Sequence, residues 1–447
     1  MFTFTLLLFS GILNLFTPIV VLSKYKKMAV YILFFYYFGI DYLNYNMGLS
    51  QDVVNYVIKS FPDVLMISLL LRLFLFEVHK KKKTSNENEQ GINLFFISFL
   101  IVSLVYIIYG IAKGNGFARS ILDWRDVGVP VLVMFLIVRT RVINFNDGHK
   151  LIKFIGFLVI LNAIKAIYDY YVFNGNVESS WRYDFLIELN LRNNADYESR
   201  MAVYQIIRNG NLRSSGFFVS ALEFSFIVGM FFFYYYLTLL NSIKFNNAKM
   251  FLYSIVSMII CFLGVYVSQV RTAFIIIVFN IIFYHLCFRQ NVMIKFRPKL
   301  TLIFATACSL IMFIIIYILG DSVDTSSYGR LAQYIYLLEA FNPIGVGFGG
   351  YKGMFDSFYV YGLLTFGLPF LYFIYFFIMR YVKIFRDNIY ADNVYFPLVG
   401  LIFTAFPVML LAMSFQHVAG SLYYSVNLLG LFLAEKYISN TKGDSIC

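Results

Sequence analysis

Three arginines and two carboxylates lie at the edges of apolar segments, where a side chain can meet both lipid and water. They are Arg213, Arg271, Arg330, Glu223 and Asp356. An arginine fork pairs with two oxygens of a phosphate at once, and a carboxylate can take the proton of a hydroxyl group. These residue types therefore predict group transfer from a phosphorylated donor, with arginines on the leaving group and Asp356 as the base.

Asp356 belongs to a stretch from Asp321 to Gly367 that separates two long apolar runs. Within it, apolar residues at 331, 335, 338 and 341 recur at helical spacing and predict an amphipathic helix over 328–341, with Arg330 on another side of the helix. The alternative is an ordinary surface loop with a helix that lies on the membrane.

A glycine-rich turn follows this predicted helix, and Asn342-Pro343 ends the helix because proline lacks the backbone donor. Gly345, Gly347 and Gly349 permit a flexible turn and a close approach of the backbone to a ligand. We expect this turn to bring Asp356 towards Arg330 and Arg271, which would form a cleft with cations and one carboxylate.

Each remaining candidate has a structural alternative. We expect Glu223 about three turns inside a span over 215–240, where an acidic group is costly unless it is paired or faces water; packing against Lys165 is the alternative. We expect Arg271 in a tight hairpin at the outer membrane interface, where it can bind a lipid-linked phosphate. The alternative is that its side chain only extends to the lipid headgroups.

The connection over 174–214 is rich in arginine and contains no lysine. Its arginines are Arg182, Arg192, Arg200, Arg208 and Arg213. This composition favours recognition of a phosphorylated or acidic group, with Arg208 as a further candidate for binding it. Pairing with the acidic residues of the same connection is the alternative reading.

The composition is that of a polytopic membrane protein. The chain has 447 residues, of which 60% are hydrophobic and 13% charged, and its mean hydropathy is +0.73. Because a bilayer core needs about 20 apolar residues per helix, we expect an all-α protein with about 13 (12–14) transmembrane helices. The net charge of +12 reflects lysines and arginines in the connections expected inside, so it indicates topology and no nucleic-acid partner.

The predicted organisation has two large outer connections between groups of spans, and the N-terminus is expected outside. The segments are 1–173 (N-terminal spans), 174–214 (long outer loop), 215–319 (central spans), 320–357 (second outer loop with the amphipathic helix) and 358–447 (C-terminal spans and inner tail). The four cysteines show no metal-ligand spacing, and we expect neither a metal nor a cofactor.

The order of the motifs resembles the O-antigen polymerase (Wzy) and O-antigen ligase superfamily. The motifs are R-x-x-G at Arg213–Gly216, S-x-x-R at Ser268–Arg271, an arginine followed by N-P-I-G-V-G-F-G at Arg330–Gly349, and D-S-F-Y at Asp356–Tyr359. The likeness covers about residues 195–380. It implies a GT-C-like membrane glycosyltransferase of the bacterial cytoplasmic membrane that acts, without a metal, on undecaprenyl-diphosphate-linked glycans and inverts the anomeric centre.

By this resemblance, Arg213, Arg271 and Arg330 would bind the diphosphate at the periplasmic face. The ligases of the family have a histidine-asparagine pair where this chain has Asp356-Ser357. The difference favours a polymerase and leaves the base open, with Asp356 as first choice and Glu223 as second. A chain-length regulator is the protein partner that the family implies.

Two alternatives to the polymerase stay open. A ligase that moves glycan to another acceptor is disfavoured by the missing histidine. A flippase or transporter of lipid-linked sugars should show internal repeats and charges at mid-membrane. The sequence shows no internal repeat, and most of the candidate charges are expected at the outer face. Of the histidines, only His417 is expected outside, and it is a reserve candidate for the base.

Overall fold

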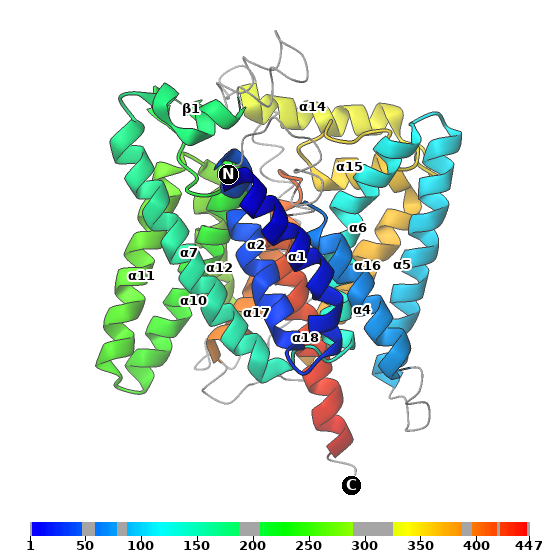
Figure 1. Cartoon of the computed structure of the whole chain (residues 1–447), viewed down its shortest axis with the longest axis horizontal. Helices are drawn as coiled ribbons and strands as arrows, with labels where there is room; N and C mark the ends of the chain where they lie inside the picture. The colour runs from blue at the N-terminus through cyan, green and yellow to red at the C-terminus, as the bar shows by residue number, and fades with distance from the viewer. Residues whose placement is uncertain are drawn as a thin grey trace. The chain divides into compact units, whose positions relative to one another are not determined.

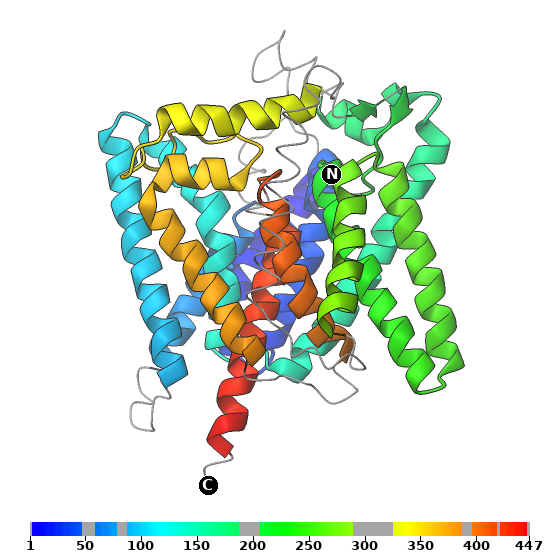
Figure 2. The same cartoon turned by 180° about the vertical axis from the view of Figure 1, so that it is seen from behind.

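The computed structural model describes residues 2–46, 59–77, 87–186, 206–208, 210–288, 325–386, 396–417 and 421–444. These residues form fourteen α-helices, one 3-10 helix and one two-stranded hairpin. The predicted all-α class is confirmed by this structure (Figures 1 and 2). The span predicted at 300–319 and much of the loop over 174–214 lie outside the described residues.

Several helices are long and apolar enough to cross a membrane. Within the described residues there are four of these, at Leu94–Ala112, Phe145–Phe173, Ala221–Lys244 and Ala248–Val267. Shorter apolar helices are at Gly11–Leu22, Arg271–His285, Leu368–Val382, Pro397–Ala412 and Leu422–Ala434. Length and composition therefore place the chain among helical membrane proteins.

The chain folds into two compact units, each made from separate stretches of sequence. The first unit contains Met1–His79, Leu136–Ile281 and Ala391–Leu401, and the second contains Lys80–Phe135, Ile282–Tyr390 and Ile402–Cys447. Among the described residues, unit boundaries fall inside three helices, α6 (Phe117–Arg139), α12 (Arg271–Phe288) and α17 (Phe396–Ala412).

The first unit is a bundle of apolar helices with a small hairpin. Its elements are α1 (Phe2–Leu22), α2 (Lys26–Asn46), α4 (Phe61–Glu77), α7 (Phe145–Phe173), the 3-10 helix η2 (Val177–Ser179), β1 (Ile207–Arg208), β2 (Asn211–Leu212), α10 (Ala221–Lys244), α11 (Ala248–Val267) and α12 (Arg271–Phe288), whose end passes into the second unit. The helices α10 and α11 run side by side in both views (Figures 1 and 2). Asparagine or serine caps begin α7, α10 and α11 by accepting backbone N–H groups.

The second unit consists of steep apolar helices and two helices that run crosswise to them. Its elements are α5 (Glu87–Ala112), most of α6, α14 (Thr325–Ala340), α15 (Phe358–Phe366), α16 (Leu368–Arg386), most of α17, and α18 (Leu422–Asp444). Within this unit α14 lies over α15, and both run crosswise to α16 (Figure 2). The buried side of α14 packs Leu337 against Val360 and Leu364 of α15.

Two predicted spans have different boundaries in the structure. The span expected over 358–378 is two helices, because Gly367 adopts a φ of +63° that ends α15, and α16 begins at Leu368-Pro369. The short span expected over 127–138 is the end of the longer helix α6, whose first half carries charged residues that hide it in a hydropathy reading.

The depth predicted for Glu223 was wrong. The helix α10 begins at Ala221, and Ser220 caps it by accepting the backbone N–H of Glu223, so Glu223 lies in the first turn. Residues 214–220 are not helical, because Gly216 has a φ of +63° and its missing side chain makes room for Asn162. Lys165 is paired with Asp169, one helical turn further along α7.

Candidate functional site

The sequence candidates fall into two groups, one in each unit. Arg208, Arg213, Glu223 and Arg271 belong to the first unit, and Arg330, Asp356 and the glycine-rich turn belong to the second. Each group is described by itself.

In the first unit, a backbone hydrogen bond joins the segments that carry Arg213 and Arg271. Ser214 donates its N–H to the carbonyl of Val267 at 3.0 Å, which connects the segment of Arg213 to the turn that precedes Arg271. Arg213 is 8% exposed, whereas Arg271 begins α12 and is exposed. Arg208 lies on β1, and the structure describes only its backbone.

A second arginine of the loop, Arg182, is buried against the same segment. Its guanidinium donates to the carbonyls of Arg213 and Val219. Burial, together with the positive charge of Arg213, lowers the pKa of Arg182 to about 9. This arginine therefore supports the fold of the R-x-x-G segment, which is a role that its sequence position did not indicate.

In the second unit, the structure brings Arg330 and Asp356 together. Nε of Arg330 lies 3.9 Å from a carboxylate oxygen of Asp356. The Arg330 side chain is 18% exposed and that of Asp356 is 57% exposed. Nε of Arg330 is buried and makes no hydrogen bond within the described residues. A guanidinium behind an exposed carboxylate can hold an anion while the carboxylate meets a second reactant.

One side of α14 faces this carboxylate. Arg330, Gln333, Tyr334 and Leu337 have the spacing i, i+3, i+4, i+7, which places them on one face of a helix. Gln333 Oε1 accepts the backbone N–H groups of Asp356 and Ser357 at 3.0 and 3.1 Å. These four residues are called the site face of α14 below. Of these residues, Gln333 fixes the backbone of Asp356, whose side chain is exposed.

The glycine-rich turn is held in place by the protein's own backbone. A side chain at Gly345 would meet the Thr365 carbonyl, and one at Gly347 would meet the backbone of Gly110. Gly347 donates its N–H to the Thr365 carbonyl at 3.0 Å, and Asn115 donates to the carbonyls of Val346 and Phe348. The close approach predicted for these glycines is therefore, in the structure, an approach to α5 and α15.

A buried carboxylate that the sequence analysis missed anchors this turn. Asp123 of α6 is 3% exposed and accepts the Gly349 N–H at 2.7 Å and the Tyr361 hydroxyl at 2.9 Å. A side chain at Gly349 would crowd Ser120, one helical turn before Asp123. Because these contacts join residues more than two hundred positions apart, local spacing gives no signal for them.

Two further charged residues in this unit were also missed. Asp126 forms an ion pair of 3.2 Å with Lys352, which lies in the segment between Gly349 and Asp356. The side chains of Asp126 and Lys352 are 54% and 29% exposed. The sequence signal for this ion pair is the position of Asp126, one helical turn after Asp123. By itself, that spacing indicates an exposed helix face.

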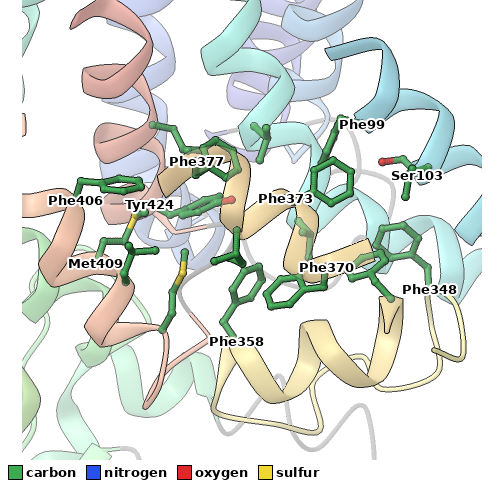
Figure 3. Close-up of a pocket in the computed structure, with 18 residues that line it drawn as sticks. Phe99, Ser103, Phe348, Phe358, Phe370, Phe373, Phe377, Phe406, Met409 and Tyr424 are labelled. Atoms are coloured by element: carbon green, nitrogen blue, oxygen red, sulfur yellow. The ribbon is translucent and has the colours of Figure 1, made fainter. Parts of the chain in front are cut away.

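An apolar cavity of about 60 Å³ lies in the same unit. Phenylalanine is the commonest residue of its lining, which also includes methionines and Tyr424 (Figure 3). Its lining includes Phe348 of the glycine-rich turn and Phe358, two residues after Asp356. A dry apolar cavity of about 150 Å³ holds one benzene molecule. The smaller space found here is too small for a sugar and belongs to the packed interior.

Comparison with known proteins adds no family. No protein-family model, no curated protein and no solved structure matches this chain. The class is therefore set by the fold: an all-α membrane protein. Among the described residues there is no cluster of histidine, cysteine and acidic side chains that could hold a metal ion.

Proposed function

We propose that this protein is a polysaccharide polymerase that joins undecaprenyl-diphosphate-linked oligosaccharide repeat units by inverting glycosyl transfer. The observation that carries the proposal is the pair of Arg330 and Asp356, in which an exposed carboxylate lies in front of a mostly buried guanidinium. The helical membrane class supports a lipid-linked substrate, and the motif order of the sequence supports the polymerase chemistry.

In the proposed reaction, Arg330 holds the diphosphate of the donor and stabilises the charge that develops on it. Asp356 accepts the proton of the acceptor sugar hydroxyl. The hydroxyl oxygen forms a bond with the anomeric carbon of the donor glycan, and the bond from that carbon to the diphosphate oxygen breaks. The products are a longer glycan on the acceptor lipid, undecaprenyl diphosphate and one proton.

The proposal includes the topology expected from the sequence. The chain crosses the bacterial cytoplasmic membrane about thirteen times, with α14 and Asp356 at the outer surface. Because an aspartate and an arginine are costly inside a bilayer, an exposed pair of this kind belongs at the interface, where a lipid diphosphate also lies. Diphosphate binding by Arg208, Arg213 and Arg271 stays a prediction, as does the role of Glu223 as second-choice base.

The test compares two carboxylates near α14: Asp356, which lies beside the site face, and Glu339, which lies on another side of the helix. Asp356→Asn should lower the rate of polymerisation by about 10²–10⁴-fold, because the proton acceptor is lost. Glu339→Gln removes an exposed carboxylate of α14 that lies outside the site face, and it should leave the rate unchanged. Equal rates in Asp356→Asn and wild type would remove Asp356 from the mechanism.

A further inference from the structure

Three aromatic side chains form a cluster beside the pair of Arg330 and Asp356. Tyr336 belongs to α14, and Tyr351 and Phe355 belong to the segment that runs back from the glycine-rich turn to α15 (Figure 2). The ring centroid of Tyr336 is 6.4 Å from that of Tyr351 and 5.7 Å from that of Phe355. The rings of Tyr351 and Phe355 are themselves 5.4 Å apart. These three residues are called the aromatic cluster below.

The chain itself and one hydrogen bond hold the aromatic cluster next to Asp356. Phe355 directly precedes Asp356, so the Cα atoms of these two residues are about 3.8 Å apart. Gln333 accepts the backbone N–H of Asp356 at 3.0 Å. Tyr336 follows Gln333 by three positions on α14, which makes their side chains neighbours on the helix surface. A ligand that lies on these rings therefore reaches the carboxylate of Asp356.

The aromatic cluster is anchored on one side and open on another. Tyr351 and Phe355 pack against the buried apolar side chains that join α14 to α15, whereas Tyr336 is 42% exposed. A tyrosine offers a large, rigid contact area at a low cost in conformational entropy, because it has only two side-chain torsions. Rings that already pack on the core lose still less freedom when a ligand binds. The cluster is therefore a preformed surface for a ligand.

Charged groups border the aromatic cluster and limit the kind of ligand that fits it. The Asp356 side chain, next to Phe355, is 57% exposed, and Lys352, next to Tyr351, forms its ion pair with Asp126. A lipid chain on these rings would take water away from the charges, which is costly. A sugar has an apolar face of C–H groups for the rings and an edge of hydroxyl groups for the polar border, so it matches both.

We propose that the aromatic cluster binds the acceptor sugar, whose hydroxyl attacks the donor glycan. This inference rests on the proposed function. The ring of Tyr336 lies against the apolar face of the sugar, and the hydroxyl that reacts lies at Asp356. Because Arg330 holds the donor diphosphate, the cluster determines the affinity for the acceptor and which of its hydroxyl groups reaches the base.

The test measures binding of a lipid-free oligosaccharide, released by mild acid from the lipid-linked repeat unit that is used for polymerisation. Because this probe lacks the diphosphate leaving group, it can be elongated only as an acceptor. The full-length protein in detergent should bind it in isothermal titration calorimetry. Tyr336→Ala should weaken binding about tenfold, as truncation of a central interface tyrosine does, and should raise the KM for the probe as acceptor with kcat nearly unchanged. Tyr336→Phe keeps the ring and should bind more tightly than Tyr336→Ala.

Two further variants separate sugar binding from a general loss of apolar surface. Leu338→Ala is the matched control, because Leu338 is 82% exposed on the same helix and lies about 200° around it from Tyr336. It should bind the probe as the wild type does. Tyr336→Leu keeps apolar volume without a ring, and it should lose affinity as Tyr336→Ala does, while its melting temperature shows that it is folded.

Wild-type affinity in the folded Tyr336→Ala and Tyr336→Leu variants would overturn the aromatic cluster as the acceptor site and leave the polymerase intact. An equal loss of affinity in Leu338→Ala, or an active wild type that does not bind the probe, would do the same. A wild type that binds the probe through Tyr336 but does not polymerise the lipid-linked unit would instead overturn the proposed function.

Discussion

At the scale of single residues, the best-defined polar contact in the second unit is made by Asp123. Its two carboxylate oxygens accept one backbone N–H and one tyrosine hydroxyl in a buried setting. A buried polar group that loses a partner costs about 1–3 kcal/mol. Asp123 thus connects the stability of α6 to the position of the glycine-rich turn, and through that turn to the segment of Asp356.

Asp123→Asn tests this connection. An asparagine replaces one carboxylate oxygen with an NH₂ donor and carries no charge. To keep both contacts the Tyr361 hydroxyl would have to turn round and accept, and both hydrogen bonds would lose their charged acceptor. We expect a loss of about 1–3 kcal/mol in unfolding free energy, seen as a lower melting temperature in detergent. Asp126→Asn, at the exposed ion pair with Lys352, should change it by less than about 1 kcal/mol. Equal melting temperatures for Asp123→Asn and wild type would contradict the assigned role.

Prediction from sequence reached part of this site. Arg330 and Asp356 were expected to meet, and they do, because a helix followed by a proline and a glycine-rich turn sends the chain back on itself. Asp123 and Asp126 were missed, because their contacts are set by the packing of α6 on a turn far away in sequence. The depth of Glu223 was wrong because hydropathy does not show that Gly216 delays the start of α10.

At the scale of elements, α14 has one side that packs on α15 and another side that is exposed. Leu337 is 9% exposed and packs on α15, whereas Leu338 is 82% exposed. Ile335 and Phe341, which belong to the apolar stripe predicted from the sequence, are also exposed, at 46% and 40%. The helix was thus predicted correctly, while its site face could be recognised only once α15 was known to lie under it.

Alanine variants of two adjacent leucines, Leu337 and Leu338, test this difference in packing. Leu337→Ala should lower the unfolding free energy by about 2 kcal/mol, because it leaves a gap against Val360 and Leu364. Leu338→Ala should change it by less than about 0.5 kcal/mol. Thermal unfolding of both variants in the same detergent measures the difference. Similar losses in the two variants would mean that α14 does not pack on α15 through Leu337.

The packing of the glycine-rich turn can be tested by comparing one of its glycines, Gly347, with Gly353, which follows the turn and also has a positive φ. Gly347 has a φ of +82° and touches the backbone of Gly110, whereas Gly353 has a φ of +72° and nothing within 4 Å of an added side chain. Gly353→Ala therefore meets only the cost of its conformation, about 1 kcal/mol. Gly347→Ala meets that cost and a backbone clash.

We accordingly expect Gly347→Ala to be clearly less stable than Gly353→Ala, and to lower polymerisation more, because the turn that precedes Asp356 is displaced. The melting temperature and the initial rate of both variants measure this. If Gly347→Ala were as stable and as active as Gly353→Ala, the turn would not be held against α5.

At the scale of the whole molecule, the class of the protein could be predicted from composition, whereas the boundaries of several helices could not. An apolar composition with basic connections predicts a helical membrane protein, and the apolar helices bear out that class. Hydropathy detects apolar stretches. It misses the first half of α6, which carries charged residues, and it misses the end of α15 at Gly367. For this reason the boundaries of several helices could not be derived from composition, and the number of about 13 spans stays a prediction.

The proposed polymerase activity belongs to the whole protein. The direct measurement uses purified wild-type protein in detergent with a synthetic undecaprenyl-diphosphate oligosaccharide repeat, and it follows the glycan products on a gel and the release of undecaprenyl diphosphate. We predict a ladder of products, each one repeat longer than the last, with one undecaprenyl diphosphate released per step. A single transfer without a ladder would indicate a ligase. Movement of the lipid across vesicle membranes without any glycan product would contradict the account and indicate a transporter.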